Sequence, residues 1–170
     1  MGKNYFFQKP DLLERDHIID DFDCGTESLN DYLKRYAYTN NRNHSSRTYV
    51  TCESKKVVGY YTITPGSVST ESAPLRVSLG LGRYPIPVII LARLAVDKEF
   101  QGMRLGEGLL KDALLRIVSA SDSIGGRAIL VHAKNNKAKI FYEKYGFEQS
   151  PIDEFHLYLL IKNIKKSFGI

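Results

Sequence analysis

The chain has 170 residues, of which 43% are hydrophobic and 25% charged, and it carries a net charge of +5. This length suits one domain with a substantial core, and this composition is typical of a globular protein rather than a disordered or fibrous one. The mild basicity favours anionic partners such as nucleic acid or a phosphorylated cofactor, although many basic proteins bind no nucleic acid.

Targeting and redox signals are weak in this chain. Two cysteines, Cys24 and Cys52, are too few for a disulfide scaffold in so large a domain, so we expect reduced thiols. The first ten residues lack the apolar run of a signal peptide, and no segment approaches the length of a membrane span. These observations predict one cytoplasmic domain over residues 1–170, without membrane contact.

The first part of the chain predicts one helix and two strands. A turn at 20–26 leads to a helix capped by Thr26 or Ser28, and we expect that helix to end within 39–41. Its apolar positions have helical spacing: Leu29, Leu33 and Tyr36. Strands are predicted over Arg47–Glu53 and 56–63, because β-branched and aromatic residues dominate both.

Residues 65–87 are rich in glycine, proline and serine and predict a long loop. Long ordered loops are often functional, so substrate specificity is assigned to this segment as a hypothesis. The continuous apolar run that follows, over 87–96, is typical of a buried central strand.

The rest of the chain alternates between helix and strand patterns. A helix is predicted over 104–120, a strand over Ala128–His132, a helix over 135–145 and a last strand over 154–161. The first of these helices carries two apolar rows: Leu105, Leu109, Ala113 and Ile117; Leu110, Leu114 and Val118. The order predicts a mixed α/β fold, in which a right-handed crossover helix joins two parallel strands.

A glycine-rich turn stands between the apolar strand and the helix after it. Gly102, Gly106 and Gly108 surround the helix start, where free N–H groups and the helix dipole would favour a pyrophosphate. No Gly-Lys-Ser/Thr follows, so the turn is not a Walker loop, and its glycine spacing differs from the dinucleotide fingerprint. The simpler alternative is a strand-to-helix turn with convenient glycines.

The helix over 135–145 carries a tyrosine whose role is open on pattern alone. Ala138, Phe141, Tyr142 and Tyr145 form one apolar stripe, and an isolated tyrosine on such a stripe is more often a core aromatic than a functional group.

Together, the stretches 91–110 and 135–147 resemble the acetyl-CoA-binding half of the GNAT (Gcn5-related) N-acetyltransferases. The loop pattern of that family is Gln or Arg, two free positions, Gly, one free position, then Gly or Ala. Gln101 and Gly106 match it, but Arg104 stands where the first glycine is expected. The tyrosine-helix pattern is matched in register by the following residues: Asn135, Ala138, Phe141, Tyr142, Gly146 and Phe147.

The resemblance implies an α/β GNAT fold, with a mixed central sheet splayed at the acetyl-CoA site and flanked by helices. It implies acetyl-CoA as cosubstrate without a metal, main-chain contacts from a splayed central strand to the pantetheine arm, and Tyr142 as the acid near the thioester sulfur. The cofactor-binding residues that it implies are Leu94, Ala95, Val96, Gln101, Gly102, Met103, Arg104, Leu105, Gly106, Glu107, Gly108 and Asn135.

Further segments, at 21–25, 59–61 and 92–97, resemble the GNAT toxins of bacterial toxin–antitoxin pairs. That resemblance implies acetylation of the aminoacyl amine of charged tRNA and neutralisation by a ribbon-helix-helix antitoxin. Basic residues that would contact tRNA phosphates are Lys134, Lys137, Lys139 and Lys144, with Arg42, Arg47, Arg83 and Arg93. The alternatives are that these lysines are merely solvated and that Arg93 is a buried structural pair.

Two other functions remain open, and so does a homodimer. The chain could be a GNAT enzyme for a small amine or a protein amine, or a non-catalytic protein that binds acyl-CoA or RNA. His132 is a candidate base, although a structural histidine is the more common case. Asp97 and Glu99, beside the turn, are expected to be solvated.

Overall fold

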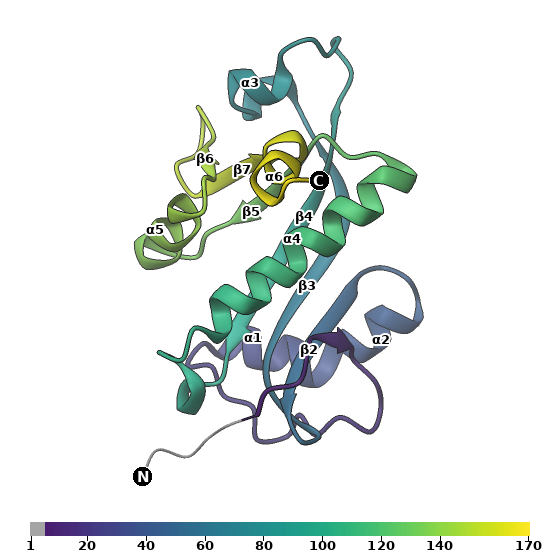
Figure 1. Ribbon diagram of the computed structural model, residues 1–170, viewed down its shortest axis with the longest axis vertical. Helices are drawn as coiled ribbons and strands as arrows, with labels where there is room; N and C mark the ends of the chain where they lie inside the picture. The colour runs from purple at the N-terminus through teal and green to yellow at the C-terminus, as the bar shows by residue number, and fades with distance from the viewer. Residues whose placement is uncertain (1–5) are drawn as a thin grey trace. The chain divides into compact units, whose positions relative to one another are not determined.

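The computed structural model describes residues 6–170 and divides into two compact units. The first unit contains the chain up to residue 64 together with 93–113, and the second contains 65–92 together with 114–170. Three elements have residues in both units: β3 (Lys56–Val68), β4 (Ile86–Val96) and α4 (Leu105–Ile124) (Figure 1).

Seven strands form one mixed sheet in the order β1-β2-β3-β4-β5-β7-β6. β2 (Arg47–Glu53) pairs antiparallel with β1 (Asp11–Leu12) and with β3. β5 (Ala128–His132) is parallel to β4, with α4 between them in the chain, and antiparallel to β7 (His156–Leu160). β6 (Glu148–Gln149) pairs with β7. The predicted mixed α/β fold with two parallel strands around a crossover helix is confirmed.

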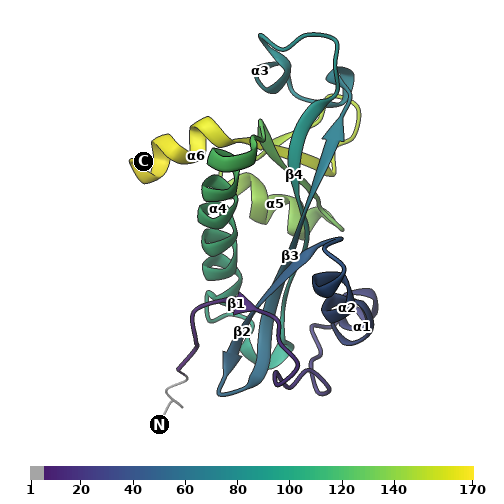
Figure 2. The same cartoon turned by 90° about the vertical axis from the view of Figure 1, so that its right-hand side faces the viewer.

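Alternation along β3 builds the two faces of the first unit. The hydroxyl of Tyr60 donates to the Leu29 carbonyl at 2.7 Å, so this ring faces the helices α1 (Glu27–Asp31) and α2 (Ala37–Arg42). Figure 2 shows both helices beside β2 and β3. The hydroxyl of the next residue, Tyr61, donates to an Asp112 carboxylate oxygen on α4 at 2.5 Å. Successive strand residues point to opposite faces, and both tyrosines are fully buried.

The first helical segment is longer than predicted. Between α1 and α2 the backbone forms a π-helical segment, Tyr32–Tyr36, and α2 continues to Arg42 rather than ending within 39–41. Asn41 is buried, and its Oδ1 accepts a hydrogen bond from the Thr48 amide at 2.8 Å. Satisfaction of its side chain by β2 explains why a residue typical of turns remains in a helix here.

The second unit holds α5 (Asn136–Lys144), which packs on β7, and α6 (Ile161–Phe168), which follows β7 directly. Its core contains aliphatic side chains from three strands and one buried tyrosine, Tyr158. The rows predicted on α4 are buried except Leu105, which is half-buried: Leu109, Leu110, Ala113, Leu114, Ile117 and Val118.

The prediction of one loop over 65–87 is wrong. β3 extends to Val68, a 3₁₀ turn covers Thr70–Ser72, and α3 (Leu75–Ser78) precedes β4. Val77 is buried in the core, and the guanidinium of Arg127 donates to its carbonyl at 3.0 Å. Tertiary packing and a long-range side-chain bond therefore order a segment whose composition is typical of loops.

The end of the chain also differs from the prediction. Residues 154 and 155 form a turn in which the Phe155 amide donates to Asp153 Oδ1 at 2.9 Å, so β7 begins only at His156. Helix α6 then follows in place of a terminal strand. Its buried residues Ile161 and Ile164 are three positions apart, as a helix requires.

Within residues 6–170, no helix combines the length and apolarity needed to cross a bilayer. Cys24 and Cys52 are both buried and unbridged, which agrees with the prediction of reduced thiols.

Candidate functional site

The glycine turn enters α4 through two residues with left-handed backbone. Gly102 has φ +83° and Arg104 has φ +62°. This conformation costs an L-residue about 1–2 kcal/mol, whereas glycine adopts it freely. Arg104 therefore has the backbone that suits the glycine of the family pattern, although it carries a side chain.

The start of α4 presents unused donors. The first hydrogen bond at this end runs from the Gly108 amide to the Arg104 carbonyl at 3.1 Å. Among the described residues, the structure records no acceptor for the amides of Leu105, Gly106 and Glu107. The helix is 20 residues long, so its dipole adds positive potential at these groups.

Charge and space at the helix start also suit an anion. A Cβ added at Gly108 would meet nothing within 4 Å, so the backbone is open there. Arg104 is highly exposed and lies 4.0 Å from the Glu107 carboxylate, which leaves most of its donors available. The turn therefore fits a pyrophosphate group.

Side chains anchor the turn to the end of β4. The side-chain Nε2 of Gln101 donates to the Val96 carbonyl at 2.9 Å and to the Cys24 carbonyl at 3.2 Å. Asp97 accepts hydrogen bonds from the amides of Glu99 at 2.9 Å and Asp23 at 3.1 Å. The expectation that Asp97 is solvated is wrong, because only 4% of it is exposed and it caps the turn; Glu99 is exposed as expected.

β4 extends beyond the segment that pairs with β5. The parallel register runs from Val88 opposite Ala128 to Leu91 opposite Val131, while β4 continues to Val96. The main chain of 94–96 thus has no registered β5 partner, and such unpaired groups are what a strand needs in order to bind an extended ligand.

The tyrosine helix begins with a side-chain cap. Asn135 has extended backbone, and its Oδ1 accepts a hydrogen bond from the Ala138 amide at 2.9 Å. Asn135 therefore has a structural role in starting α5, whatever else it contacts.

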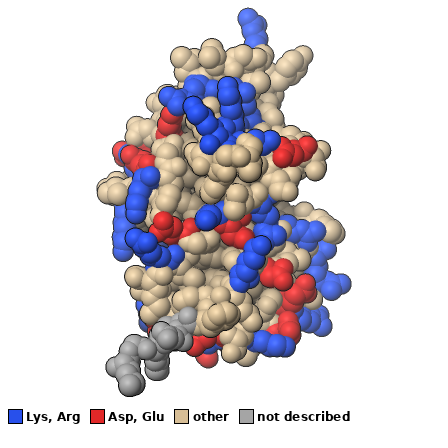
Figure 3. Space-filling view, in the orientation of Figure 1, with Lys and Arg blue, Asp and Glu red and all other residues tan. Residues whose placement is uncertain are grey.

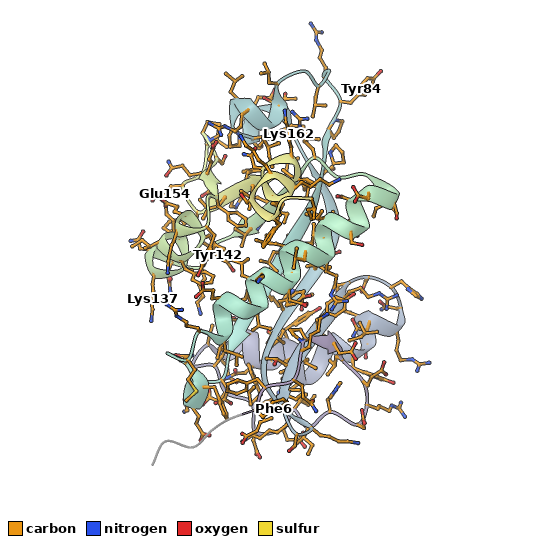
Figure 4. The ribbon with its side chains drawn as sticks, in the orientation of Figure 1. Phe6, Tyr84, Lys137, Tyr142, Glu154 and Lys162 are labelled. Carbon is orange, nitrogen blue, oxygen red and sulfur yellow. The ribbon has the colours of Figure 1, made fainter. Side chains whose placement is uncertain are left out.

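Tyr142 lies on α5 (Figure 4) and is only 6% exposed. Its ring meets those of Phe141 and Phe147 edge to face, with centroids 5.1 Å and 5.4 Å away. Burial raises the pKa of Tyr142, so its hydroxyl is protonated at neutral pH. Among the described residues, the structure records no hydrogen bond to this hydroxyl, so it is available as a donor.

His132 is held in a histidine pair. Its ring stacks on that of His156 with centroids 4.0 Å apart, and His156 Nε2 lies 3.4 Å from Asp153 Oδ2. Burial, followed by the neighbouring His156, lowers the pKa of His132. This arrangement favours the structural interpretation of His132 over a role as catalytic base.

Comparison with known proteins identifies the family. The model of the acetyltransferase (GNAT) domain matches residues 44–149. The chain belongs to the GNAT family.

A tRNA-acetylating toxin of Mycobacterium tuberculosis (strain ATCC 25618 / H37Rv) is 47% identical over 151 residues, which cover 89% of this chain and 90% of the relative. Among solved structures, AtaT complexed with acetyl-methionyl-tRNAfMet matches with a TM-score of 0.88 and 29% identity, covering 96% and 99% of the two chains. AtaTR bound with acetyl-CoA matches with a TM-score of 0.81 and 30% identity, covering 95% and 98%.

The lysines predicted to surround the tyrosine helix of this GNAT protein share their surface with acids. Lys139 lies 3.4 Å from the Glu154 carboxylate and 3.9 Å from that of Glu143. Lys144 lies over the Tyr145 ring at 5.5 Å. The charge at this helix is therefore mixed rather than uniformly basic.

The proposed arginine contacts are divided between structural and open positions. Arg47 donates to the Asn41 carbonyl at 2.8 Å and lies 2.7 Å from His44 Nδ1, so the fold uses it. Arg93 lies 3.6 Å above the Tyr32 ring, a cation–π contact in place of the buried ion pair considered above. Arg83 is exposed.

Within residues 6–170, no group of three or more His, Cys, Asp or Glu side chains is placed so that it could hold a metal ion.

The basic helix α6 was not predicted from the sequence. The signal was present, because Ile161 and Ile164 alternate with three lysines at helical spacing.

Proposed function

We propose that this GNAT acetyltransferase acetylates the aminoacyl amine of charged tRNA and thereby blocks translation, acting as a cytoplasmic toxin. The observation that carries the proposal is the 47% identity to a tRNA-acetylating toxin across 89% of the chain. The likeness to AtaT in complex with acetyl-methionyl-tRNAfMet supports the same acceptor class. The whole of 1–170 would act as one catalytic domain.

Acetyl-CoA would be held chiefly by main-chain groups. The amides of Leu105, Gly106 and Glu107 would receive the pyrophosphate, with the Arg104 guanidinium as an additional donor. The main chain of 94–96, on the side where it has no registered β5 partner, would bind the pantetheine arm. Gln101 would hold the turn against the end of β4 through its hydrogen bond to Val96, Asn135 would position the start of α5 as its cap, and Gly102, Met103 and Gly108 complete the stretch around the helix start.

Tyr142 would serve the leaving group. Acetyl transfer would form the amide C–N bond and break the thioester C–S bond, and the proton lost by the amine would reach the departing CoA sulfur through solvent. A thiol has a pKa of about 8.5, below that of a tyrosine whose pKa burial has raised, so complete proton transfer from Tyr142 is uphill. We therefore assign to Tyr142 a hydrogen bond to the sulfur that strengthens as negative charge develops there.

The remaining chemistry needs neither a metal nor a covalent nucleophile. A main-chain N–H of β4 can stabilise the oxyanion, and most of the rate enhancement would come from holding amine and thioester in line.

An antitoxin would restrain the activity. Solved relatives include AtaT bound to the C-terminus of the antitoxin AtaR, at 29% identity to this chain. We infer a protein antitoxin for this chain as well, and a ribbon-helix-helix protein remains the predicted class.

The test is an acetylation assay with labelled acetyl-CoA and three acceptors: charged tRNA, uncharged tRNA and a polyamine. Label should appear on charged tRNA alone, and nuclease digestion should release an N-acetylaminoacyl adenosine. Turnover on the polyamine with no labelled tRNA would instead indicate a small-amine GNAT enzyme.

A further inference from the structure

Helix α6 borders an open groove in the second unit. The groove has a volume of about 800 Å³. Four of its lining residues are cationic, Arg127, Lys162, Lys165 and Lys166, and none of the lining residues that the structure describes is acidic. Figure 3 shows Lys and Arg side chains gathered over α6.

Two of these cations already have partners within the described residues. Arg127 donates through its guanidinium to the carbonyls of Val77 and Leu79, at 3.0 Å and 3.2 Å. Lys165 forms an ion pair with Asp122. Arg127 still contributes positive potential, whereas the charge of Lys165 is offset by Asp122 at the surface.

The other two are available. Lys162, labelled on α6 in Figure 4, and Lys166 are exposed, and within residues 6–170 the structure records no ion pair for either. They are four positions apart, so they project from the same face of α6 on consecutive turns. This face differs from that of α5, where acids offset the lysines.

The exposed groups on α6 distinguish a nucleic-acid partner from a lipid surface. A lipid surface requires a broad exposed apolar helix face, but Ile161 and Ile164 of α6 are buried, and Phe168 near its end is 37% exposed. A phosphate backbone requires open, repeated positive charge, and Lys162 and Lys166 supply this, because the nearby acid Asp122 pairs with Lys165 and not with them.

We propose that the α6 groove binds the phosphate backbone of the tRNA acceptor through Lys162 and Lys166. The inference rests on the proposed function and moves the main phosphate contacts from α5 to α6. The groove sets the affinity for the acceptor, while the chemistry remains with the acetyl-CoA site and Tyr142.

The experiment compares wild type with Lys162→Glu/Lys166→Glu and with a matched control, Lys34→Glu/Lys111→Glu. Both pairs are exposed and change the net charge equally, and the control lysines lie outside the groove. The KM for charged tRNA should rise at least about 10-fold in the α6 variant, because two phosphate contacts become repulsions, while kcat and acetyl-CoA affinity stay unchanged. Binding of tRNA at several salt concentrations should show a log–log slope shallower by about 1.5 than that of the control.

A second variant, Lys162→Gln/Lys166→Gln, separates loss of phosphate contacts from misfolding. It removes the positive charges of α6 without introducing negative charges there. It should keep the wild-type melting temperature and show a smaller rise in KM. Equal KM values and salt slopes for the α6 and control variants would overturn the inference. So would loss of binding to an acidic peptide or anionic vesicles with tRNA binding unchanged. Failure of the proposed function would look different, since wild type would then acetylate no charged tRNA while its salt-dependent tRNA binding could still be compared.

Discussion

At the level of single residues, Tyr142 combines a core position with a free hydroxyl. Its ring packs edge to face between two phenylalanines, and among the described residues no group accepts or donates at its oxygen. An available donor in a packed ring cage is therefore compatible with both the core and the catalytic interpretations, and a conservative variant separates them.

Tyr142→Phe keeps the ring and removes only the hydroxyl. We expect kcat to fall about 100-fold, the usual scale for losing a positioned hydrogen-bond donor to developing negative charge, with acetyl-CoA affinity nearly unchanged. Single-turnover kinetics and calorimetry measure the two quantities. Tyr145→Phe is the control and should cost much less. Unchanged kcat with a lowered melting temperature would establish Tyr142 as a core aromatic only.

Cys52 gives a prediction about pH. Burial raises its pKa to about 11, above the value of an unfolded thiol, so the folded state retains this proton longer than the unfolded state does. The free energy of unfolding should therefore decrease as pH rises from about 9 to 11. Urea titrations across that range should show a steeper decrease for wild type than for Cys52→Ala. Parallel pH profiles for the two proteins would contradict the buried-thiol account.

At the level of elements, Arg104 at the start of α4 combines a left-handed backbone with an exposed guanidinium, and two variants distinguish the effects of these two features. Arg104→Gly removes the strain of a left-handed backbone at residue 104, whereas Arg104→Ala keeps it. We therefore expect the free energy of unfolding in urea to be about 1 kcal/mol higher for the glycine variant than for the alanine variant. Both variants remove the guanidinium. Equal loss of acetyl-CoA affinity in the two variants would show that it contacts phosphate, whereas equal stability would contradict the strain at residue 104.

The start of α5 depends on a cap. Asn135→Ala removes the acceptor for the Ala138 amide and should lower the free energy of unfolding by about 1 kcal/mol, while Asn135→Asp should retain most of it. Thermal unfolding measures both. If both variants lost acetyl-CoA affinity without losing stability, Asn135 would instead act directly on the cofactor.

Elements with strong periodicity were predictable from sequence, and elements that depend on tertiary partners were not. The predicted β2 and β5 have the observed bounds, because each carries a compact run of β-branched and apolar residues. The segment 65–87 was taken for a loop because its order depends on Val77 packing and on an arginine fifty positions away. In the same way, Asn41 stays helical because β2 satisfies its side chain.

At the level of the whole molecule, the family motifs indicated the chemistry better than they indicated the charge distribution. The loop and tyrosine patterns are local in sequence, so they could be recognised without a structure. The acids that offset Lys139 are Glu143 on the same helix and Glu154 in a turn fifteen residues later. On α6, folding pairs Lys165 with Asp122, and the available charge is that of the other lysines of the helix. Net charge alone therefore could not locate the proposed RNA surface.

In the proposed function, acetyl transfer to charged tRNA stops translation. The most direct measurement adds the protein and acetyl-CoA to a bacterial translation extract and identifies the aminoacyl-adenosines by mass spectrometry. We expect protein synthesis to stop while N-acetylated aminoacyl-adenosine accumulates, and both effects should develop about 100-fold more slowly with Tyr142→Phe. Arrest without acetylated aminoacyl-adenosine, or equal arrest by the Tyr142→Phe variant, would contradict the claim.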